Sequence, residues 1–415
     1  MVRRRKFGRA LTLLVAAAGL AACVADPGRA GYGGPALVGA GALPTGRRVA
    51  ILLPLTGPNA ELGQAMLRAA QLSLDQPGAP SLDVRDTGGT PAGAAEAAKS
   101  ALAAGAGLIL GPLTAGETAA AAPVAKASGV PVLAFTSDAA LAQPGVWTLG
   151  ITPAQQVRRL VLAVQAEGKT RVAAVLSKNA FGDAMARGLT ATAAAAGLPE
   201  PQIVRYSGGS SAALNAALKD ASGYSARRSA TEQQQQDARA QSDADSQQQP
   251  ADPGPQAAPP PLDALLLDAV GGSLGQAAPL LATYDVAPNQ VRVLGPALWA
   301  REASRLSAIA GAWYAAPDPA QRASFEKQYA AKYNAPPREY ASLAYDAAAI
   351  ARVTADSIGF TPGALARPEG FAGVDGVLAL LPDGQVRRGL AIFEIDRGGS
   401  HIVQPAPQSV AAPGV

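Results

Sequence analysis

Short apolar runs, each followed by a turn of small residues, constrain this chain more than any other feature. The first run, Val49–Leu53, ends at Pro54 and Gly57, and an apolar pattern with helical spacing follows over Leu62–Leu74. A run without polar alternation is typical of a strand covered on both faces, as in a parallel sheet. Strand, turn and helix in this order predict the first unit of a doubly wound α/β fold. Ligands of such folds bind beyond the carboxyl ends of the strands.

The same pattern recurs along most of the chain and predicts two α/β lobes. The first series contains the strands Val49–Leu53, Leu82–Arg85, Leu108–Leu110, Val132–Phe135 and Trp147–Leu149. The second series contains Val172–Leu176, Ile203–Tyr206, Leu262–Leu267, Val291–Leu294 and Ala312–Tyr314. Helical patterns separate these runs, so each right-handed step should add a parallel neighbour. Asp383-Gly384, between the apolar runs Val377–Leu380 and Leu390–Ile395, predicts a hairpin.

Two polar segments interrupt or follow this pattern. Residues 224–261 are predicted to be a disordered insertion, because Ala226–Pro261 contains no large apolar or aromatic side chain, holds two glutamine runs and ends in three prolines. The most economical function for it is an inert spacer, with partner binding as the alternative. Residues 399–415 have no periodicity and are predicted to be a tail. The folded domain is therefore expected to span residues 47–398.

The first 46 residues have the composition of a targeting segment. Residues 1–22 combine a basic start, an apolar core from Leu11 to Leu20 and small residues before Cys23. The core is shorter than the ~20 residues of a membrane span and is typical of a signal peptide. Leu20-Ala-Ala-Cys23 resembles the bacterial lipobox, which implies cleavage before Cys23 and lipid attachment to it. The alternative is an ordinary signal peptide with an incidental cysteine.

The lipobox resemblance also implies a location. Val24, rather than Asp, follows Cys23, which by resemblance favours the outer membrane over the inner membrane, with the protein anchored by lipid in the periplasm. Residues 23–46 are mainly Gly, Ala and Pro and are predicted to be a disordered tether.

Composition argues against several classes of function. The chain has 415 residues, 48% of them hydrophobic, and a net charge of only +4, much of which comes from arginine and lysine in the first ten residues. We find no basic stripe for nucleic acid. With one histidine, His401, and one cysteine, the sequence predicts neither a histidine-rich metal site nor a disulfide. No nucleophile–base pair or metal cluster is visible, so we expect no enzyme activity, metal or cofactor; a pair of carboxylates is the remaining route to catalysis.

The order of elements resembles the type I periplasmic binding proteins of the leucine-binding kind. The segments that carry the resemblance are Pro54–Gly63, Ile109–Leu113, Gly129–Val132, Asn179–Asp183 and Asp383-Gly384. The resemblance implies two doubly wound parallel-sheet lobes, joined by three crossovers, with a ligand cleft between them. The leucine-binding receptors hold an amino acid there and deliver it to an ABC permease.

The amino acid contacts of that family are only partly present. Thr114 is the one hydroxyl in Leu113–Gly116, and Asp138 lies where it would repel a carboxylate. Ala297 stands where the family has a glutamate for the ligand's ammonium group. A buried zwitterion without these partners would retain unpaired charge.

A second resemblance is to the LpoA-type lipoproteins that activate penicillin-binding proteins. It rests on Ile51–Gly57 together with Gly111-Pro-Leu113. It implies a partner, a penicillin-binding protein that synthesises peptidoglycan, and a regulatory role without chemistry. A solute receptor of a branched-chain amino acid type ABC transporter, with a small-molecule ligand, is the alternative.

Candidate ligand contacts are the polar and aromatic residues near the predicted strand ends. They are Thr56, Thr114, Thr136, Ser137, Asn179, Phe181, Asp268 and Trp299. Each has a structural alternative, since hydroxyl and amide side chains also cap turns and helices, and a tryptophan also packs in a core.

Overall fold

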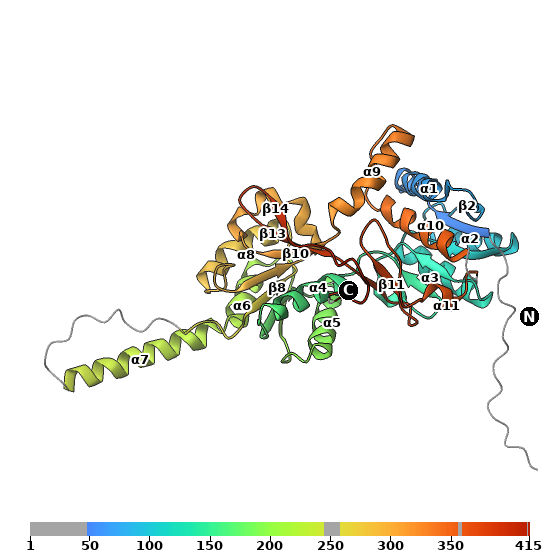
Figure 1. Ribbon diagram of the computed structural model, residues 1–415. Helices are drawn as coiled ribbons and strands as arrows, with labels where there is room; N and C mark the ends of the chain where they lie inside the picture. Colours follow the sequence, from blue (N-terminus) through green and yellow to red (C-terminus); the bar gives the residue numbers. More distant parts are fainter. Residues whose placement is uncertain (1–47, 245–257, 356–358, 413) are drawn as a thin grey trace, which may run out of the picture. The chain divides into compact units, whose positions relative to one another are not determined.

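Figure 1 presents the computed structural model of the protein, which describes residues 48–244, 258–355, 359–412 and 414–415. All of these residues belong to one unit, Gly41–Val415. The predicted signal peptide, the predicted lipidation site Cys23 and the predicted tether lie outside the described residues. In the part of the chain that is described, no helix is both long enough and apolar enough to cross a membrane.

The first five strands form a wholly parallel sheet in the order β2-β1-β3-β4-β5. They are β1 (Arg48–Leu53), β2 (Leu82–Asp86), β3 (Ala106–Leu110), β4 (Val132–Ala134) and β5 (Val146–Thr148). The apolar run that opens the pattern is β1, and its residues Val49–Leu53 are completely buried. Because both faces of this sheet are covered, the run contains no alternating polar residues.

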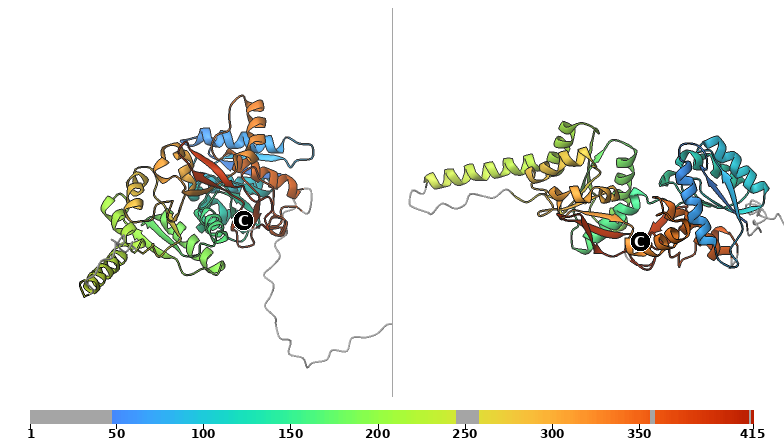
Figure 2. Two further views of the ribbon diagram at one scale, coloured as in Figure 1. Left: turned by 60° about the vertical axis from the view of Figure 1, so that its left-hand side comes forward. Right: turned by 90° about the horizontal axis from the view of Figure 1, so that it is seen from above.

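The two faces of the first sheet pack into separate hydrophobic cores. The helices are α1 (Ala60–Leu74), α2 (Pro91–Ala103), α3 (Ala115–Ala127), α9 (Pro319–Tyr333), α10 (Ala341–Ala355) and the short α11 (Pro362–Leu365). Ile51 packs with residues of α1 and α10, whereas Leu52 packs with the alanines of α2 and α3. Helices α1 and α10 come from distant parts of the sequence and lie side by side (Figures 1 and 2).

The second sheet has the order β14-β13-β10-β9-β8-β6-β7. Its strands are β6 (Val172–Ser177), β7 (Gln202–Tyr206), β8 (Ala264–Leu267), β9 (Arg292–Gly295), β10 (Trp313–Ala316), β13 (Ala391–Ile395) and β14 (Ser400–Gln404). The first five of these are parallel, and β13 and β14 are antiparallel additions. Its helices include α4 (Pro153–Ala166), α5 (Ala180–Ala195), α6 (Ser211–Ala221) and α8 (Gly272–Thr283).

Three connections cross between the two lobes. They link β5 to α4, β10 to α9, and the hairpin β11 (Leu378–Leu380) and β12 (Val386–Arg388) to β13. The chain therefore begins the first lobe, builds most of the second, returns to the first and ends in the second. The predicted fold class, two doubly wound lobes with three crossovers, is confirmed.

The structure differs from the predicted disordered insertion at residues 224–261. Residues Tyr224–Ala244 form the continuous helix α7 (Figures 1 and 2), while residues 245–257 lie outside the described part. Alanine, arginine, glutamine and glutamate are strong helix formers, so this segment can be helical without a core. Its first turn is also anchored, because buried Arg227 donates from Nη2 to the carbonyl oxygen of Tyr284 at 3.0 Å.

The C-terminal region also differs from the prediction. The hairpin turn at Asp383-Gly384 is present, but its second arm is Val386–Arg388 rather than Leu390–Ile395. A tight turn pairs the residues that flank it directly, which leaves the later run free to become β13. Part of the predicted tail at residues 399–415 is strand β14, which pairs with β13 and so satisfies an edge that would otherwise be open.

Candidate functional site

Thr56 follows β1 at the carboxyl end of the first sheet, and its hydroxyl is bonded within the same lobe. Its Oγ1 donates to Asp86 Oδ2 at 2.7 Å, and Asp86 Oδ1 accepts from the main-chain nitrogens of Leu55 and Gly88 at 2.8 Å each. Burial alone raises the pKa of Asp86, but the bonds from Thr56, Gly88 and Leu55 outweigh it and lower that pKa below its ordinary value. Asp86, which sequence reasoning missed, therefore organises this turn as a carboxylate.

Thr114 follows β3 and forms the N-cap of α3. Its Oγ1 donates to Glu117 Oε2 at 2.7 Å, and its main-chain nitrogen donates to the same oxygen at 3.0 Å. The other oxygen of Glu117 accepts from the Thr87 hydroxyl, and Glu117 has no exposed surface. The spacing Thr-x-x-Glu is a capping-box signature, so the sequence did contain a signal for Glu117.

Thr136 and Ser137 follow β4. Thr136 is buried, and its Oγ1 accepts from the main-chain nitrogen of Asp138 at 3.1 Å. Asp138 in turn caps a short 3-10 helix, η1 (Ala139–Leu141), by accepting from Ala140. Ser137 is exposed. The structure thus joins Thr136 and Asp138 in one local turn.

Asn179 and Phe181 lie where β6 leads into α5. Asn179 is the N-cap of this helix, and its Oδ1 accepts from the main-chain nitrogen of Gly182 at 2.8 Å. Phe181 is half-buried and packs on the core beneath α4 and α5. Both side chains therefore have structural partners in the second lobe.

Asp268 follows β8 and connects the ends of three neighbouring strands. Its Oδ2 accepts from the main-chain nitrogen of Ser177 at 2.8 Å and from the Ser177 hydroxyl. Its Oδ1 accepts from the Tyr206 hydroxyl at 3.4 Å. The pKa of Tyr206 is raised to about 12, mainly because the hydroxyl is buried and secondly because it lies next to the charge of Asp268. Both oxygens of this buried carboxylate accept hydrogen bonds from its own lobe, and sequence reasoning identified neither Ser177 nor Tyr206.

Trp299 lies in the 3-10 helix η2 (Ala297–Arg301), which follows β9. Its ring is buried, and Nε1 donates to the carbonyl oxygen of Ala269 at 2.8 Å. The ring lies so close to Gly295 that a Cβ there would be 2.2 Å from it. The nearby main-chain nitrogen of Ala297 donates to Gln156 Oε1 at 2.8 Å.

The strand ends therefore bring the candidates together in two groups. Thr56, Thr114 and Thr136 follow three adjacent strands of the first sheet, and Asn179 and Asp268 follow two adjacent strands of the second. An ion pair between Arg301 of η2 and Glu339, just before α10, connects the two lobes. Neither member of this pair was among the predicted residues.

The described residues offer little for metal or acid–base chemistry. Within them, no group of three or more His, Cys, Asp and Glu side chains could hold a metal ion. The one histidine, His401, is exposed on the edge strand β14, where its Nδ1 is 3.1 Å from Asp396 Oδ2. Apart from the exposed Ser137, the strand ends present hydroxyl and carboxylate groups that are bonded within their own lobes.

The sequence pattern of the periplasmic binding protein family matches residues 47–400 of the chain. Among curated protein sequences, by contrast, none matches it.

Solved structures with the same fold include two kinds of protein. A putative branched-chain amino acid ABC transporter from Rhodospirillum rubrum is 20% identical with a TM-score of 0.64, over 86% of this chain and 99% of that chain. The C-domain of LpoA from Haemophilus influenzae, a regulator of PBP1A, is 14% identical with a TM-score of 0.59, over 86% of this chain and 99% of that chain. Full-length LpoA is 15% identical with a TM-score of 0.63, and the chain covers 59% of it. At these identities the likeness shows the fold alone.

Proposed function

The chain belongs to the periplasmic binding protein family, and from that premise we propose that it is a lipid-anchored envelope protein that activates a peptidoglycan synthase. The family and its fold are those of binding proteins and regulators. The proposed action is to bind a penicillin-binding protein in the periplasm, without chemistry of its own. Cys23, followed by Val24, supplies the proposed lipid attachment and favours the outer membrane.

One observation carries this proposal: three of the polar side chains at the strand ends are already bonded to residues of their own lobes. Thr56 is bonded to Asp86, Thr114 to Glu117, and Asp268 to Ser177. A receptor that buries an amino acid needs strand-end groups that exchange water for the ligand's carboxylate and ammonium groups. Groups that already form internal hydrogen bonds would have to break those bonds before they could bind an amino acid.

Two further features support the same role. Ala297 provides no carboxylate for an ammonium group, and its main-chain nitrogen is bonded to Gln156. The segments Ile51–Gly57 and Gly111-Pro-Leu113 resemble the activator lipoproteins, and a protein with this fold, the LpoA C-domain, is a regulator of PBP1A.

Capture of a penicillin-binding protein tests the proposal. The full chain, immobilised, is incubated with detergent-solubilised envelopes in which penicillin-binding proteins carry a fluorescent penicillin. We expect a fluorescent band, and a faster rate of peptidoglycan synthesis when the captured enzyme is assayed with added protein. A leucine-binding solute receptor of the same fold is the control. If the chain captures no more fluorescence than that receptor, the activator proposal is wrong.

The alternative is a solute receptor for an ABC permease of the branched-chain amino acid type. It is favoured by the clustering of Thr56, Thr114 and Thr136 after three adjacent strands, and by the exposed Ser137 beside them. Calorimetry with a panel of amino acids and their amides distinguishes the two functions. Binding of an amino acid with a free energy near about −8 kcal/mol, which corresponds to micromolar affinity, would favour the receptor.

A further inference from the structure

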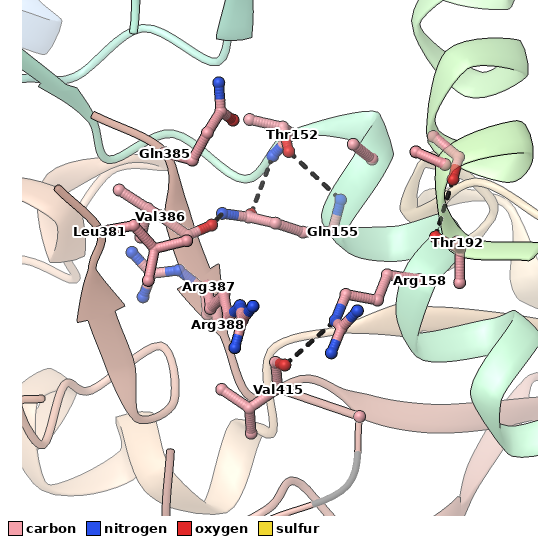
Figure 3. A pocket seen from close by; sticks show the side chains of 14 residues that line it. Thr152, Gln155, Arg158, Thr192, Leu381, Gln385, Val386, Arg387, Arg388 and Val415 are labelled. Carbon is pink, nitrogen blue, oxygen red and sulfur yellow. Dashed lines mark hydrogen bonds between the residues drawn. The ribbon is translucent and has the colours of Figure 1, made fainter. Parts of the chain in front are cut away.

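A pocket of about 200 Å³ lies among α4, α5 and the β11–β12 hairpin, apart from the strand-end residues (Figure 3). Three of the described residues that line the pocket are arginines, and no residue of this lining has an acidic side chain. The arginines are Arg158 of α4 and Arg387 and Arg388 of β12. The pocket also borders two of the three crossovers, since Thr152 caps the start of α4 and Arg388 ends β12.

The framework of the pocket is held by hydrogen bonds of Thr152 and Gln155, which use none of the arginine side chains. Thr152 and Gln155 form a capping box at the start of α4, with bonds of 3.0 and 3.2 Å. Gln155 Nε2 also donates to the carbonyl oxygen of Val386 at 2.6 Å, which fixes β12 against this helix (Figure 3). On the other side, Gly188 of α5 allows close packing, because a Cβ there would be 2.8 Å from Ala154 Cα.

Arg388 has unused donors although its side chain is completely buried. Its Nη2 donates to the carbonyl oxygen of Leu149 at 3.1 Å, but Nε and Nη1 have no hydrogen-bond partner among the described residues. Nη1 is 3.6 Å from Asp346 Oδ2, beyond normal hydrogen-bond distance. A guanidinium carries five N–H donors, and leaving them unpaired inside a protein is costly.

The other two arginines repel each other. Arg387 is exposed and Arg158 is half-buried. Burial first, and the charge of Arg387 second, lower the pKa of Arg158 below its ordinary value. Arg158 and Arg387 are two cations in one lining that contains no acidic side chain, an arrangement that favours an anion between them.

The chain itself already places one acceptor in this pocket. The main-chain oxygen of Val415 accepts from Arg158 Nε at 3.1 Å (Figure 3). Leu381, Val386 and Ala191 supply apolar surface in the same lining. The pocket therefore combines donors for an oxygen with apolar contacts for an aliphatic group.

We propose that this pocket binds a small carboxylate with an aliphatic side chain, such as the free carboxyl end of a short peptide. Arg158 and Arg387 bind the carboxylate, because a guanidinium matches the two oxygens of a carboxylate in one plane. Leu381 and Val386 contact the aliphatic part of the ligand. The buried Arg388 adds a third positive charge to the same lining. The site is independent of the activator role, because it uses none of the strand-end residues.

Calorimetry with matched peptides tests this site in the full chain. The probes are N-acetyl-alanyl-alanine, the same compound as its C-terminal amide, and inorganic phosphate. We expect the acid to bind and the amide to bind roughly tenfold more weakly or not at all. Arg387→Gln should weaken binding of the acid roughly tenfold. Arg187→Gln, an exposed arginine of α5 outside the lining, should leave it unchanged.

The oxygen of Val415 competes for Arg158, so a variant that lacks residues 413–415 should bind the acid more tightly than the full chain. Several results would overturn the proposal. They are equal binding of acid and amide, binding of phosphate without binding of the acid, equal losses in Arg387→Gln and Arg187→Gln, and absence of binding in both the full and the shortened chain.

Discussion

Asp346 of α10 and Arg388 of β12 face each other inside the protein, with Oδ2 and Nη1 3.6 Å apart and both side chains buried. Burial first, and the charge of Asp375 second, raise the pKa of Asp346, while Arg388 and the main-chain nitrogen of Val374 lower it in part. The desolvation of a buried carboxylate thus exceeds its attraction to the nearby arginine. The pair joins a helix of the first lobe to the strand that leads into the third crossover.

This pair makes stability depend on pH in a defined direction. The pKa of Asp346 rises from 3.8 to about 7 on folding, so the folded protein holds a proton that the unfolded chain loses. The stability that this proton gives the folded protein is fully present below about pH 4 and is lost as the pH rises to about 7. Over that range the unfolding free energy falls by up to about 1.4 kcal/mol per pH unit. Asp346→Asn stays neutral, so in urea unfolding its stability relative to wild type should increase from about pH 5 to about pH 7. Parallel pH curves for the two proteins would contradict this.

Asp268→Asn should weaken the junction of β6, β7 and β8. One amide oxygen replaces two carboxylate oxygens, so donors from Ser177 or Tyr206 lose their acceptor. A loss of about 2 kcal/mol in unfolding free energy is expected from urea titration. The pKa of Tyr206, now about 12, should fall part of the way towards 10, which ultraviolet titration of tyrosine would detect. An unchanged tyrosine titration would show that Asp268 does not act on Tyr206.

Gly182→Ala should be strongly destabilising, although alanine normally favours a helix. A Cβ at this position of α5 would be 2.1 Å from the carbonyl oxygen of Ser177 and 2.9 Å from Asp268 Oδ2. We expect a loss of at least about 2 kcal/mol in unfolding free energy. The matched control is Gly275→Ala in α8, where nothing lies within 4 Å and a gain of about 0.5–1 kcal/mol is expected. Equal effects of the two substitutions would contradict this packing.

Arg227→Ala should release the start of α7 from the second lobe. Arg227 donates to the carbonyl oxygens of Ser222, Tyr284 and Ala258 and pairs with Asp285 at 3.1 Å. Its removal should cost about 2–3 kcal/mol and increase amide hydrogen exchange in the first turns of α7. Arg228→Ala is the control, because Arg228 is exposed and, among the described residues, pairs along the helix with Tyr224 and Glu232. If both variants exchange like wild type, Arg227 is not the anchor.

Predictions from the sequence were most successful where local patterns and long-range packing agree. Val49–Leu53 could be recognised as a buried strand because full burial on two faces removes polar alternation. The same reasoning was less successful at Asp383-Gly384, where the turn was recognised but Leu390–Ile395 was given the wrong partner. Pairing depends on which backbone edge is open in space, and no local pattern records that.

The strand-end residues show the same limit of prediction from local sequence patterns. Their positions after strands could be predicted, but not their partners: Asp86 for Thr56 and Ser177 for Asp268 come from other strands. For α7, helix propensity outweighed the lack of apolar residues, and the anchor Arg227 acts through Tyr284, far along the chain.

The order of strands and helices, and hence the two-lobed α/β fold, could be predicted from the sequence alone, because hydrophobic periodicity is a local property of the chain. Only the tertiary structure decided which polar groups are already bonded and which remain available. Arg158, Arg387 and Arg388 line one pocket only because a helix and a hairpin more than half the chain apart pack together. Hydrogen bonds act over about 3 Å and charges over about 10 Å, so their partners depend on which residues folding brings together and not on distance along the sequence.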